Sequence, residues 1–270
     1  AKRWRGDMSN RLVEKMNALR SDNRSGVAPY VTAGDGGMET TLSVLHALDQ
    51  AGASCIELGI PFSDPIADGP VLQAASERAL ASGASLNSAL AMLAQFRTEG
   101  GQAPIAVMSY ANPLVRNGLS ETAQRVADSG GDALIVPDIP LEEGAMLEEA
   151  CALCGLCPIF FAAPTSSDER IQEAGARTRG FLYVVGRVGV TGAGTTFGEE
   201  TQSFLNRAQK LSQAPIAVGF GISSPESVRA AVQNADLAIV GTALVQRLHE
   251  SNKPAIEADS FLRELLQGLN

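Results

Sequence analysis

The sequence lacks any long apolar run. Although 45% of its 270 residues are hydrophobic, they are never gathered into the roughly 18 consecutive residues that a membrane-spanning helix needs. The first residues, AKRWRGD, are basic, but no apolar segment follows them as in a secretory signal. We therefore expect no membrane span and a cytoplasmic protein, or a plastid stroma protein if the source is a plant or alga.

Positive charge is also scarce. The chain has 21 Lys and Arg against 30 Asp and Glu, which gives a net charge of -9 and a pI near 4.8. Such a balance argues against a nucleic acid partner, because binding the phosphate backbone requires basic surface. A small anionic ligand remains compatible with it, since backbone N–H groups at a helix N-terminus bind phosphate without basic side chains.

Cysteine is rare, with 4 in the chain. Cys151, Cys154 and Cys157 have the CxxCxxC spacing of part of an iron–sulfur protein. Phe161 stands where the fourth ligand of that pattern belongs. We interpret the first two as the end of a helix and Cys157 as the start of a strand, all packing as small hydrophobes. No disulfide is expected in a reducing compartment.

Histidine is scarcer still, with 2 in the chain. His46 and His249 both fall inside segments of helical spacing and away from the strand ends. We interpret both as structural. No Ser-His-Asp pattern and no clustered metal ligands stand out, so acyl-enzyme and metal-dependent hydrolysis are weak hypotheses.

What the sequence does contain is a regular alternation of short apolar runs with helical segments. Most runs are apolar at consecutive positions, which is typical of parallel strands covered on both faces. The predicted strands are 27–34, 55–60, 104–110, 133–139, 157–163, 181–186, 215–221 and 237–241.

The segments between the runs have helical spacing and helix boundary signals. Ser85, Ser120 and Ser224 are candidate N-caps, and Gly52 is a candidate stop. Two further helices are expected, one near residues 9–22 before the first strand and one near 72–81 after the second.

Eight strands, each followed by helix, predict an α/β fold. We expect a (β/α)8 TIM barrel with an extra N-terminal helix and an extra helix after strand 2, formed by a single domain over residues 1–270. The rival architecture is an open, doubly wound sheet.

In a barrel, catalytic residues gather at the carboxyl ends of the strands. Glu57 ends an apolar strand, and the segment ELGIPFSDPIADGP that it opens also contains Asp64 and Asp68. Burial raises the pKa of a glutamate toward neutrality, where it can both give and take a proton. A satisfied structural carboxylate is the alternative. Asp64 and Asp68 precede proline and glycine as turn formers do, and spacing alone does not rank the three acids.

Two glycine-rich strand ends indicate a phosphate site. Residues 219–223 and Gly241-Thr242 follow strands seven and eight, where many barrels bind phosphate. A helix beginning at Thr242 would present its first amides to an anion. Alternatively, the glycines only permit tight turns. Neither segment is a Walker or dinucleotide-binding motif.

A long loop, RVGVTGAGTTFGEE at 187–200, follows the sixth strand. Loops of this length in a compact domain are usually functional or disordered. We predict a gating loop that closes over a ligand and expels water. A plain surface excursion is the alternative.

At this point the motifs resemble a known family, the α subunit of tryptophan synthase, across nearly the whole chain. The most specific segment is ELGIPFSDPIADGPVLQ, which is similar to the family's sequence around two catalytic acids. YVTAGD, YANP, GRVGVTGA, GFGISSPE and VGTALV follow the family's order and spacing.

The resemblance implies cleavage of indole-3-glycerol phosphate to indole and glyceraldehyde 3-phosphate, a retro-aldol lyase reaction without metal or organic cofactor. Glu57 matches the general acid/base, and Asp68 matches the acid that pairs with the indole N–H. Thr191 matches a lid threonine that orders Asp68. The residues matching substrate-binding positions are Tyr110, Tyr183, Thr191, Gly192, Phe220, Gly221, Gly241 and Thr242.

The resemblance also implies a partner. Subunits of this family pair with a PLP-dependent β subunit in an αββα (α2β2) assembly, and residues 61–70 and 112–117 resemble the β-contacting surface. One departure is Gly36-Gly37, where the family commonly has proline after TAGD, and we expect a more flexible loop there. The alternatives are a stand-alone indole-releasing lyase, an inactive α-like activator of a β subunit, and another phosphate-binding barrel.

Overall fold

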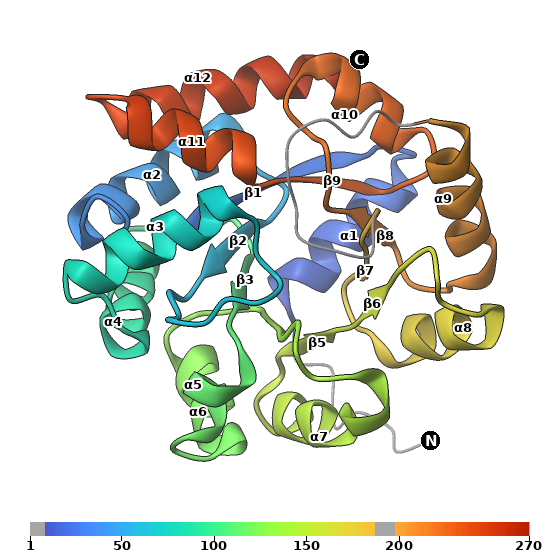
Figure 1. Ribbon diagram of the computed structural model, residues 1–270, viewed down its shortest axis with the longest axis horizontal. Coiled ribbons are helices and arrows are strands. Elements are labelled where there is room, and N and C mark those ends of the chain that lie inside the picture. The colour runs from blue at the N-terminus through green and yellow to red at the C-terminus, as the bar shows by residue number, and fades with distance from the viewer. Residues whose placement is uncertain (1–8, 187–197, 270) are drawn as a thin grey trace.

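The strands of the chain form the inner ring of a barrel, and the helices surround them (Figure 1). The computed structural model describes residues 9–186 and 198–269. Within these residues the sheet has nine strands, and every pairing in it is parallel. They are β1 (Gly26–Thr32), β2 (Ile56–Gly59), β3 (Ile105–Met108), β4 (Ala133–Ile135), β5 (Cys157–Ile159), β6 (Phe161–Ala162), β7 (Leu182–Val184), β8 (Ile216–Val218) and β9 (Leu237–Val240).

The sheet closes on itself through consecutive residues of one predicted strand. Its order is β5-β4-β3-β2-β1-β9-β8-β7-β6, so β5 and β6 are the two edges, and only Phe160 separates them in the chain. The predicted strand 157–163 is divided there because the Phe160 amide donates to the Thr178 hydroxyl at 3.1 Å. The Phe160 carbonyl still accepts from the Tyr183 amide at 2.9 Å. The barrel prediction is confirmed, with one strand in two parts.

The helices follow the strands in the predicted alternation. They are α1 (Arg11–Ser21), α2 (Met38–Ala51), α3 (Pro70–Ala81), α4 (Leu86–Thr98), α5 (Ala111–Val115), α6 (Leu119–Asp128), α7 (Ala145–Cys154), α8 (Asp168–Arg177), α9 (Glu199–Leu211), α10 (Pro225–Val232), α11 (Thr242–Glu250) and α12 (Pro254–Leu266). The extra helices predicted before strand 1 and after strand 2 are α1 and α3. Short α5 and the C-terminal α12 were not predicted. None of the helices in the described part combines the length and apolar content needed to cross a bilayer.

Four helix boundaries were predicted from capping residues in the sequence, and the structure confirms three of them. Ser85 and Ser224 cap α4 and α10 through reciprocal bonds with the serine three residues later. Gly52 ends α2 in the left-handed conformation. The prediction that Ser120 caps a helix is wrong, because α6 begins at Leu119 and Gly118 occupies the N-cap with φ of 91°.

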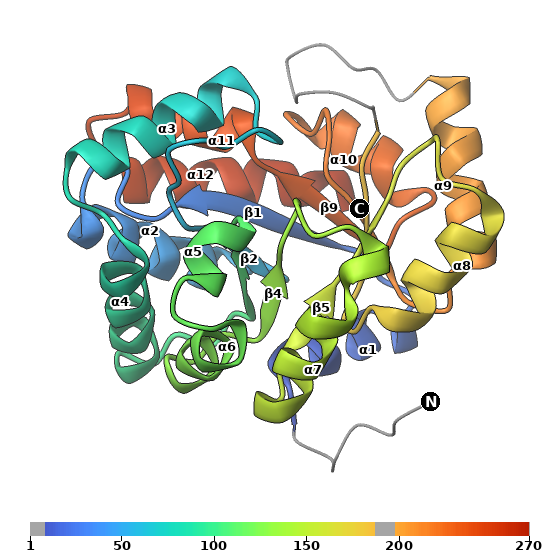
Figure 2. The same cartoon turned by 60° about the horizontal axis from the view of Figure 1, so that its bottom comes forward.

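The barrel interior is filled by small and medium side chains at its lower end. Ala106, Ala133 and Ala217 share one buried cluster with Leu12 and Met16 of α1. Helix α1 therefore closes the amino-terminal end of the barrel, away from α3 (Figure 2). The opposite end, where the strands reach their carboxyl termini, is left for a site.

A buried charge network ties α1 to the barrel. Asp132, 2% exposed, accepts from Arg97 of α4 at 2.9 Å and from Arg11 of α1 at 3.0 Å. It also accepts from the Ile105 amide at 2.8 Å. The Asn10 side chain, which caps α1, donates to the Asp132 carbonyl at 2.9 Å. This network fixes the lower end of the barrel and does not reach the carboxyl ends of the strands.

Candidate active site

Glu57 points into the barrel from β2. It lies opposite Tyr30 on β1 and Ala106 on β3, and only 2% of the Glu57 surface is exposed. Neither carboxylate oxygen has a hydrogen-bond partner within the described residues. Burial, followed by the negative charge of Asp68, raises the pKa of Glu57 to about 8, and an interaction with the Tyr183 hydroxyl offsets part of that rise. A buried acid without a partner is costly unless it is protonated.

Asp68 returns toward Glu57 from the loop between β2 and α3. The loop turns sharply, with the Asp68 amide donating to the Pro65 carbonyl at 3.0 Å. Gln73 in α3 donates to the Asp68 carbonyl at 2.9 Å. The residue is 6% exposed, and burial raises the pKa of its carboxyl group to about 6. A hydrogen bond from Tyr110 limits that rise.

Tyr110 holds the Asp68 loop in place. Its hydroxyl accepts from the Ala67 amide at 2.9 Å and donates to the Asp68 carboxylate. Its ring stacks on Phe62, with the centroids 5.2 Å apart. Tyr110 is 3% exposed and precedes α5. The structure thus places Tyr110 beside Asp68 at the mouth of the barrel.

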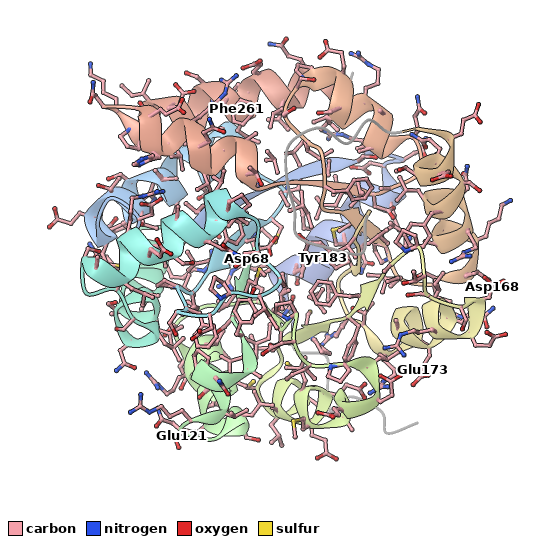
Figure 3. The ribbon with its side chains drawn as sticks, in the orientation of Figure 1. Asp68, Glu121, Asp168, Glu173, Tyr183 and Phe261 are labelled. Atoms are coloured by element: carbon pink, nitrogen blue, oxygen red, sulfur yellow. The ribbon has the colours of Figure 1, made fainter. Side chains whose placement is uncertain are left out.

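Tyrosine is gathered at this site. The chain has 3 tyrosines, and Tyr30, Tyr110 and Tyr183 each have a pKa that is raised by burial and by the charge of Asp68. The charge of Glu57 also raises the pKa of Tyr30 and of Tyr183. Figure 3 shows Tyr183 and Asp68 near the centre of the molecule, whereas Glu121, Asp168 and Glu173 lie at its periphery. The two acids therefore lie among three phenol rings.

Tyr30 was not among the residues that the sequence singled out. It lies within β1, two residues before the strand end, where an aromatic side chain is ordinarily taken as core. The sequence contains one signal that could have found it. Tyr30 and Glu57 stand inside adjacent predicted strands, 27–34 and 55–60, and pairing the middles of these strands brings the two residues side by side.

The predicted phosphate residues lie at the ends of adjacent strands. β8 and β9 pair with Val218 opposite Ala238, so Phe220 and Gly221 follow the strand next to Gly241 and Thr242. Gly241 is the N-cap of α11, no side chain among the described residues caps this helix, and Thr242 is its first residue. The first amides of α11 can therefore donate to an anion. The Ser223 and Ser224 amides both donate to the Ser227 hydroxyl at 2.9 Å.

Part of the predicted gating loop lies outside the described residues. Thr191 and Gly192 are among these, within 187–197. The last residues of the predicted loop do not belong to a loop, because Glu199 and Glu200 form the first turn of α9 after Gly198 at the N-cap.

The loop after β1 has a backbone that proline would not permit. Gly36 has φ of 78° and Gly37 has φ of 99°, whereas the proline ring holds φ near -65°. The Asp35 carboxylate is nevertheless fixed, because Arg78 of α3 donates to both of its oxygens at 2.8 and 2.7 Å. The glycines therefore accompany a loop path different from the one a proline would impose.

The remaining candidates from the sequence lie away from the acids. His46 contacts Glu99 on the helical layer at 2.7 Å, and His249 is in the last turn of α11. As predicted, Cys151 and Cys154 lie on α7, which ends at Cys154, and Cys157 opens β5. All four cysteines are buried and free. Among the described residues, no three His, Cys, Asp or Glu side chains are grouped as a metal site would need.

Comparisons with known proteins identify the family of the chain. The model of the family described as "Tryptophan synthase alpha chain" matches residues 16–268. The tryptophan synthase alpha chain of Nitrosococcus oceani is 40% identical over 97% of this chain and 98% of its own. That of Chloroflexus aggregans is 42% identical over 95% of this chain and 97% of its own.

Solved structures give the same result. Tryptophan synthase subunit alpha from Legionella pneumophila superposes with a TM-score of 0.89 at 34% identity, covering 97% of this chain and 98% of its own. A chain from the tryptophan synthase a2b2 complex of Pyrococcus furiosus superposes with a TM-score of 0.82 at 35% identity, covering 90% and 98%. The chain therefore belongs to the tryptophan synthase alpha chain family, whose members are lyases.

Proposed function

We propose that this chain cleaves indole-3-glycerol phosphate to indole and glyceraldehyde 3-phosphate, as the α subunit of tryptophan synthase. The observation that supports this best is the difference between the two acids. With a pKa of about 8 for Glu57 and about 6 for Asp68, Glu57 is protonated and Asp68 ionised near pH 7. Two carboxyl groups whose environments separate their pKa values take the acid and the anion roles.

The reaction needs both of these states. The protonated Glu57 donates its proton to carbon 3 of the indole ring, which leaves positive charge on the ring nitrogen. The Asp68 carboxylate accepts a hydrogen bond from that N–H and stabilises the charge. The bond from carbon 3 to the glycerol chain then breaks, and its electron pair restores the aromatic ring.

Glu57 completes the cycle as a base. As the carbon–carbon bond breaks, the hydroxyl on the departing carbon loses its proton to the Glu57 carboxylate and becomes the aldehyde. Glu57 is left protonated, as it began. These steps use only carboxyl groups of this chain. PLP belongs to the β partner.

The phosphate is assigned to the other side of the mouth. The uncapped first turn of α11, with Thr242 and Gly241, supplies amide and hydroxyl donors for it. The neighbouring Phe220 and Gly221 complete the cradle, together with Gly192 in our assignment. Binding energy from this remote group holds the reacting carbon against Glu57.

A β subunit is the partner that we infer, in an α2β2 assembly within the cytoplasm. The loop that carries Asp68 exposes Ile66, which is 77% exposed, and α5 beside it exposes Val115, which is 43% exposed. Tyr110 links this loop to α5. A subunit docked there would act directly on the position of Asp68.

The decisive experiment is an indole-release assay on indole-3-glycerol phosphate, with and without the cognate β subunit. The wild-type chain should release indole, and the β subunit should raise the rate severalfold. Glu57→Gln should lower the rate by about 10²–10⁴-fold, the usual contribution of a general acid/base.

The same assay separates the alternatives. A rate that the β subunit does not change would indicate a stand-alone lyase. An inactive wild-type chain that still activates a β subunit, with Glu57→Gln equally effective, would indicate an activator and would overturn the proposal.

A further inference from the structure

We propose that Tyr30 is a positioning residue for Glu57, because its ring and hydroxyl fill the space directly beyond Glu57 on β2 and keep water from the Glu57 carboxyl group. This inference rests on the proposed function for its meaning. It concerns the ligand-free protein and is testable without substrate.

The strand register brings Tyr30 and Glu57 together. Tyr30 on β1 lies opposite Glu57 on β2. Side chains two apart on a strand share a face, so Gly59 faces the same interior as Glu57, one step nearer the mouth. A methyl group built on Gly59 would lie 2.0 Å from the Tyr30 hydroxyl oxygen and 2.5 Å from the ring carbon that bears it. The phenol therefore leans across to β2 and occupies the volume that a side chain at position 59 would take.

The same arrangement recurs across the barrel. Tyr183 on β7 lies opposite Ala217 on β8. A methyl group on Gly219, two residues further, would lie 2.5 Å from the Tyr183 hydroxyl oxygen. Each tyrosine thus leans onto a glycine of the next strand, two residues beyond its register partner. Tyr183 interacts with Glu57 from β7, and Tyr30 covers Glu57 from β1.

The covering ring of Tyr30 is itself held in place. Tyr30 is 5% exposed and packs in one cluster with Leu72 and Ala75 of α3 and Val245 of α11. Its hydroxyl accepts from the Thr32 hydroxyl at 3.5 Å, at the limit of a hydrogen bond. The ring cannot swing outward without displacing two helices, so it forms a fixed wall.

A fixed wall matters because, within 9–186 and 198–269, neither Glu57 oxygen has a hydrogen-bond partner at normal distance, and the Tyr183 hydroxyl offsets only part of the effect of burial. Exclusion of water is the largest influence on that carboxyl group. The titratable groups that face it are Asp68 from the loop before α3, Tyr183 from β7, Tyr30 from β1 and Cys55, which directly precedes β2. Among these, Tyr30 fills the volume immediately above Glu57.

The test compares Tyr30→Leu, Tyr30→Phe and the control Phe96→Leu. Phe96 is a fully buried ring of α4 on the outer side of the barrel, so its replacement reproduces the loss of a buried aromatic away from the site. The readout is the carboxylic-acid band of Glu57 in infrared spectra of the ligand-free protein as a function of pH. Glu57→Gln identifies the band.

In Tyr30→Leu, water should reach the Glu57 carboxyl group. The midpoint of the Glu57 titration should then fall from about 8 by about one pH unit or more, toward the ordinary pKa of glutamate. Tyr30→Phe keeps the ring and should shift the midpoint much less. Phe96→Leu should lower the melting temperature and leave the midpoint in place. If Tyr30→Leu does not fold, Tyr30→Met provides the same comparison with a more adaptable side chain.

An unmoved midpoint in folded Tyr30→Leu or Tyr30→Met would overturn the proposal, as would an equal shift in Phe96→Leu. These outcomes are independent of lyase activity, because no substrate is present. An inactive wild-type protein with the expected titration would instead remove the proposed function and leave the role of Tyr30 toward Glu57 intact.

Discussion

The hydroxyl of Tyr110 donates a hydrogen bond to the carboxylate of Asp68 while it accepts one from the amide of Ala67. The bond favours the charged form of Asp68, and it therefore opposes the rise in pKa that burial causes. The anion proposed to stabilise the indole nitrogen is thus maintained near pH 7 by a residue from a different strand end.

Replacing Tyr110 by Phe should raise the pKa of Asp68 above its value of about 6. A hydrogen bond to a charged group contributes roughly 1.5–3 kcal/mol, so the acidic limb of the kcat/KM profile should move up by about one pH unit. Phe62→Leu is the control, because it removes the stacked ring and keeps the hydroxyl. An acidic limb that does not move in Tyr110→Phe would contradict the assignment of that limb to Asp68.

The eight-strand barrel could be predicted because consecutive apolar residues mark strands covered on both faces. The division of the strand at 157–163 could not, because it depends on the Thr178 hydroxyl, 18 residues away, taking the Phe160 amide. A contact of that kind leaves no periodic trace in the sequence. The Ser120 prediction failed for a local reason, since the backbone at Gly118 starts the helix before the serine.

The site was only partly visible in the sequence. Glu57 could be located because it is a carboxylate in an apolar strand, although the prediction that it ends the strand is wrong, since β2 continues to Gly59. Asp64 and Asp68 look alike as turn residues. In the structure Asp64 is exposed and accepts from Ser63, whereas Asp68 is buried. The path of the loop decides which of the two acids is buried. In the sequence, only the family resemblance distinguished Asp68 from Asp64. Tyr30 was missed because its role depends on strand register.

Stability should depend on pH through Glu57. Its pKa is raised from 4.5 to about 8 on folding, so the folded protein binds a proton that the unfolded chain releases between these values. The contribution of Glu57 to the free energy of unfolding should therefore be at its maximum below about pH 4.5. The free energy of unfolding should then decrease as the pH rises from 4.5 to about 8. Urea unfolding at several pH values measures this decrease.

Glu57→Gln should flatten that decrease, because glutamine stays neutral at every pH. The variant should be at least as stable as the wild type at pH 8 while it loses activity. Glu121→Gln on the exposed side of α6 is the matched control and should preserve the wild-type pH dependence. A wild-type curve that rises between pH 4.5 and 8 would require other groups to dominate.

Asp132→Ala should strongly destabilise the protein. It would leave Arg97, whose side chain is 12% exposed, without its carboxylate partner and would orphan the Ile105 amide. Breaking a buried pair from one side costs about 3–5 kcal/mol. Asp259→Ala, which removes the partner of Arg263 on the surface of α12, should cost less than about 1 kcal/mol. Chemical unfolding of both variants tests this, and equal losses would count against the network at the lower end of the barrel.

Thr242→Val tests the phosphate side of the site. Valine keeps the branched shape at the first position of α11, so the helix amides stay in place and only the hydroxyl donor is lost. A hydrogen bond to a charged group contributes roughly 1.5–3 kcal/mol, so KM for indole-3-glycerol phosphate should rise at least tenfold while kcat changes less. The inhibition constant of inorganic phosphate should rise in parallel. Thr242→Ser restores the donor and should behave as the wild type, and a KM that is insensitive to both changes would place the phosphate elsewhere.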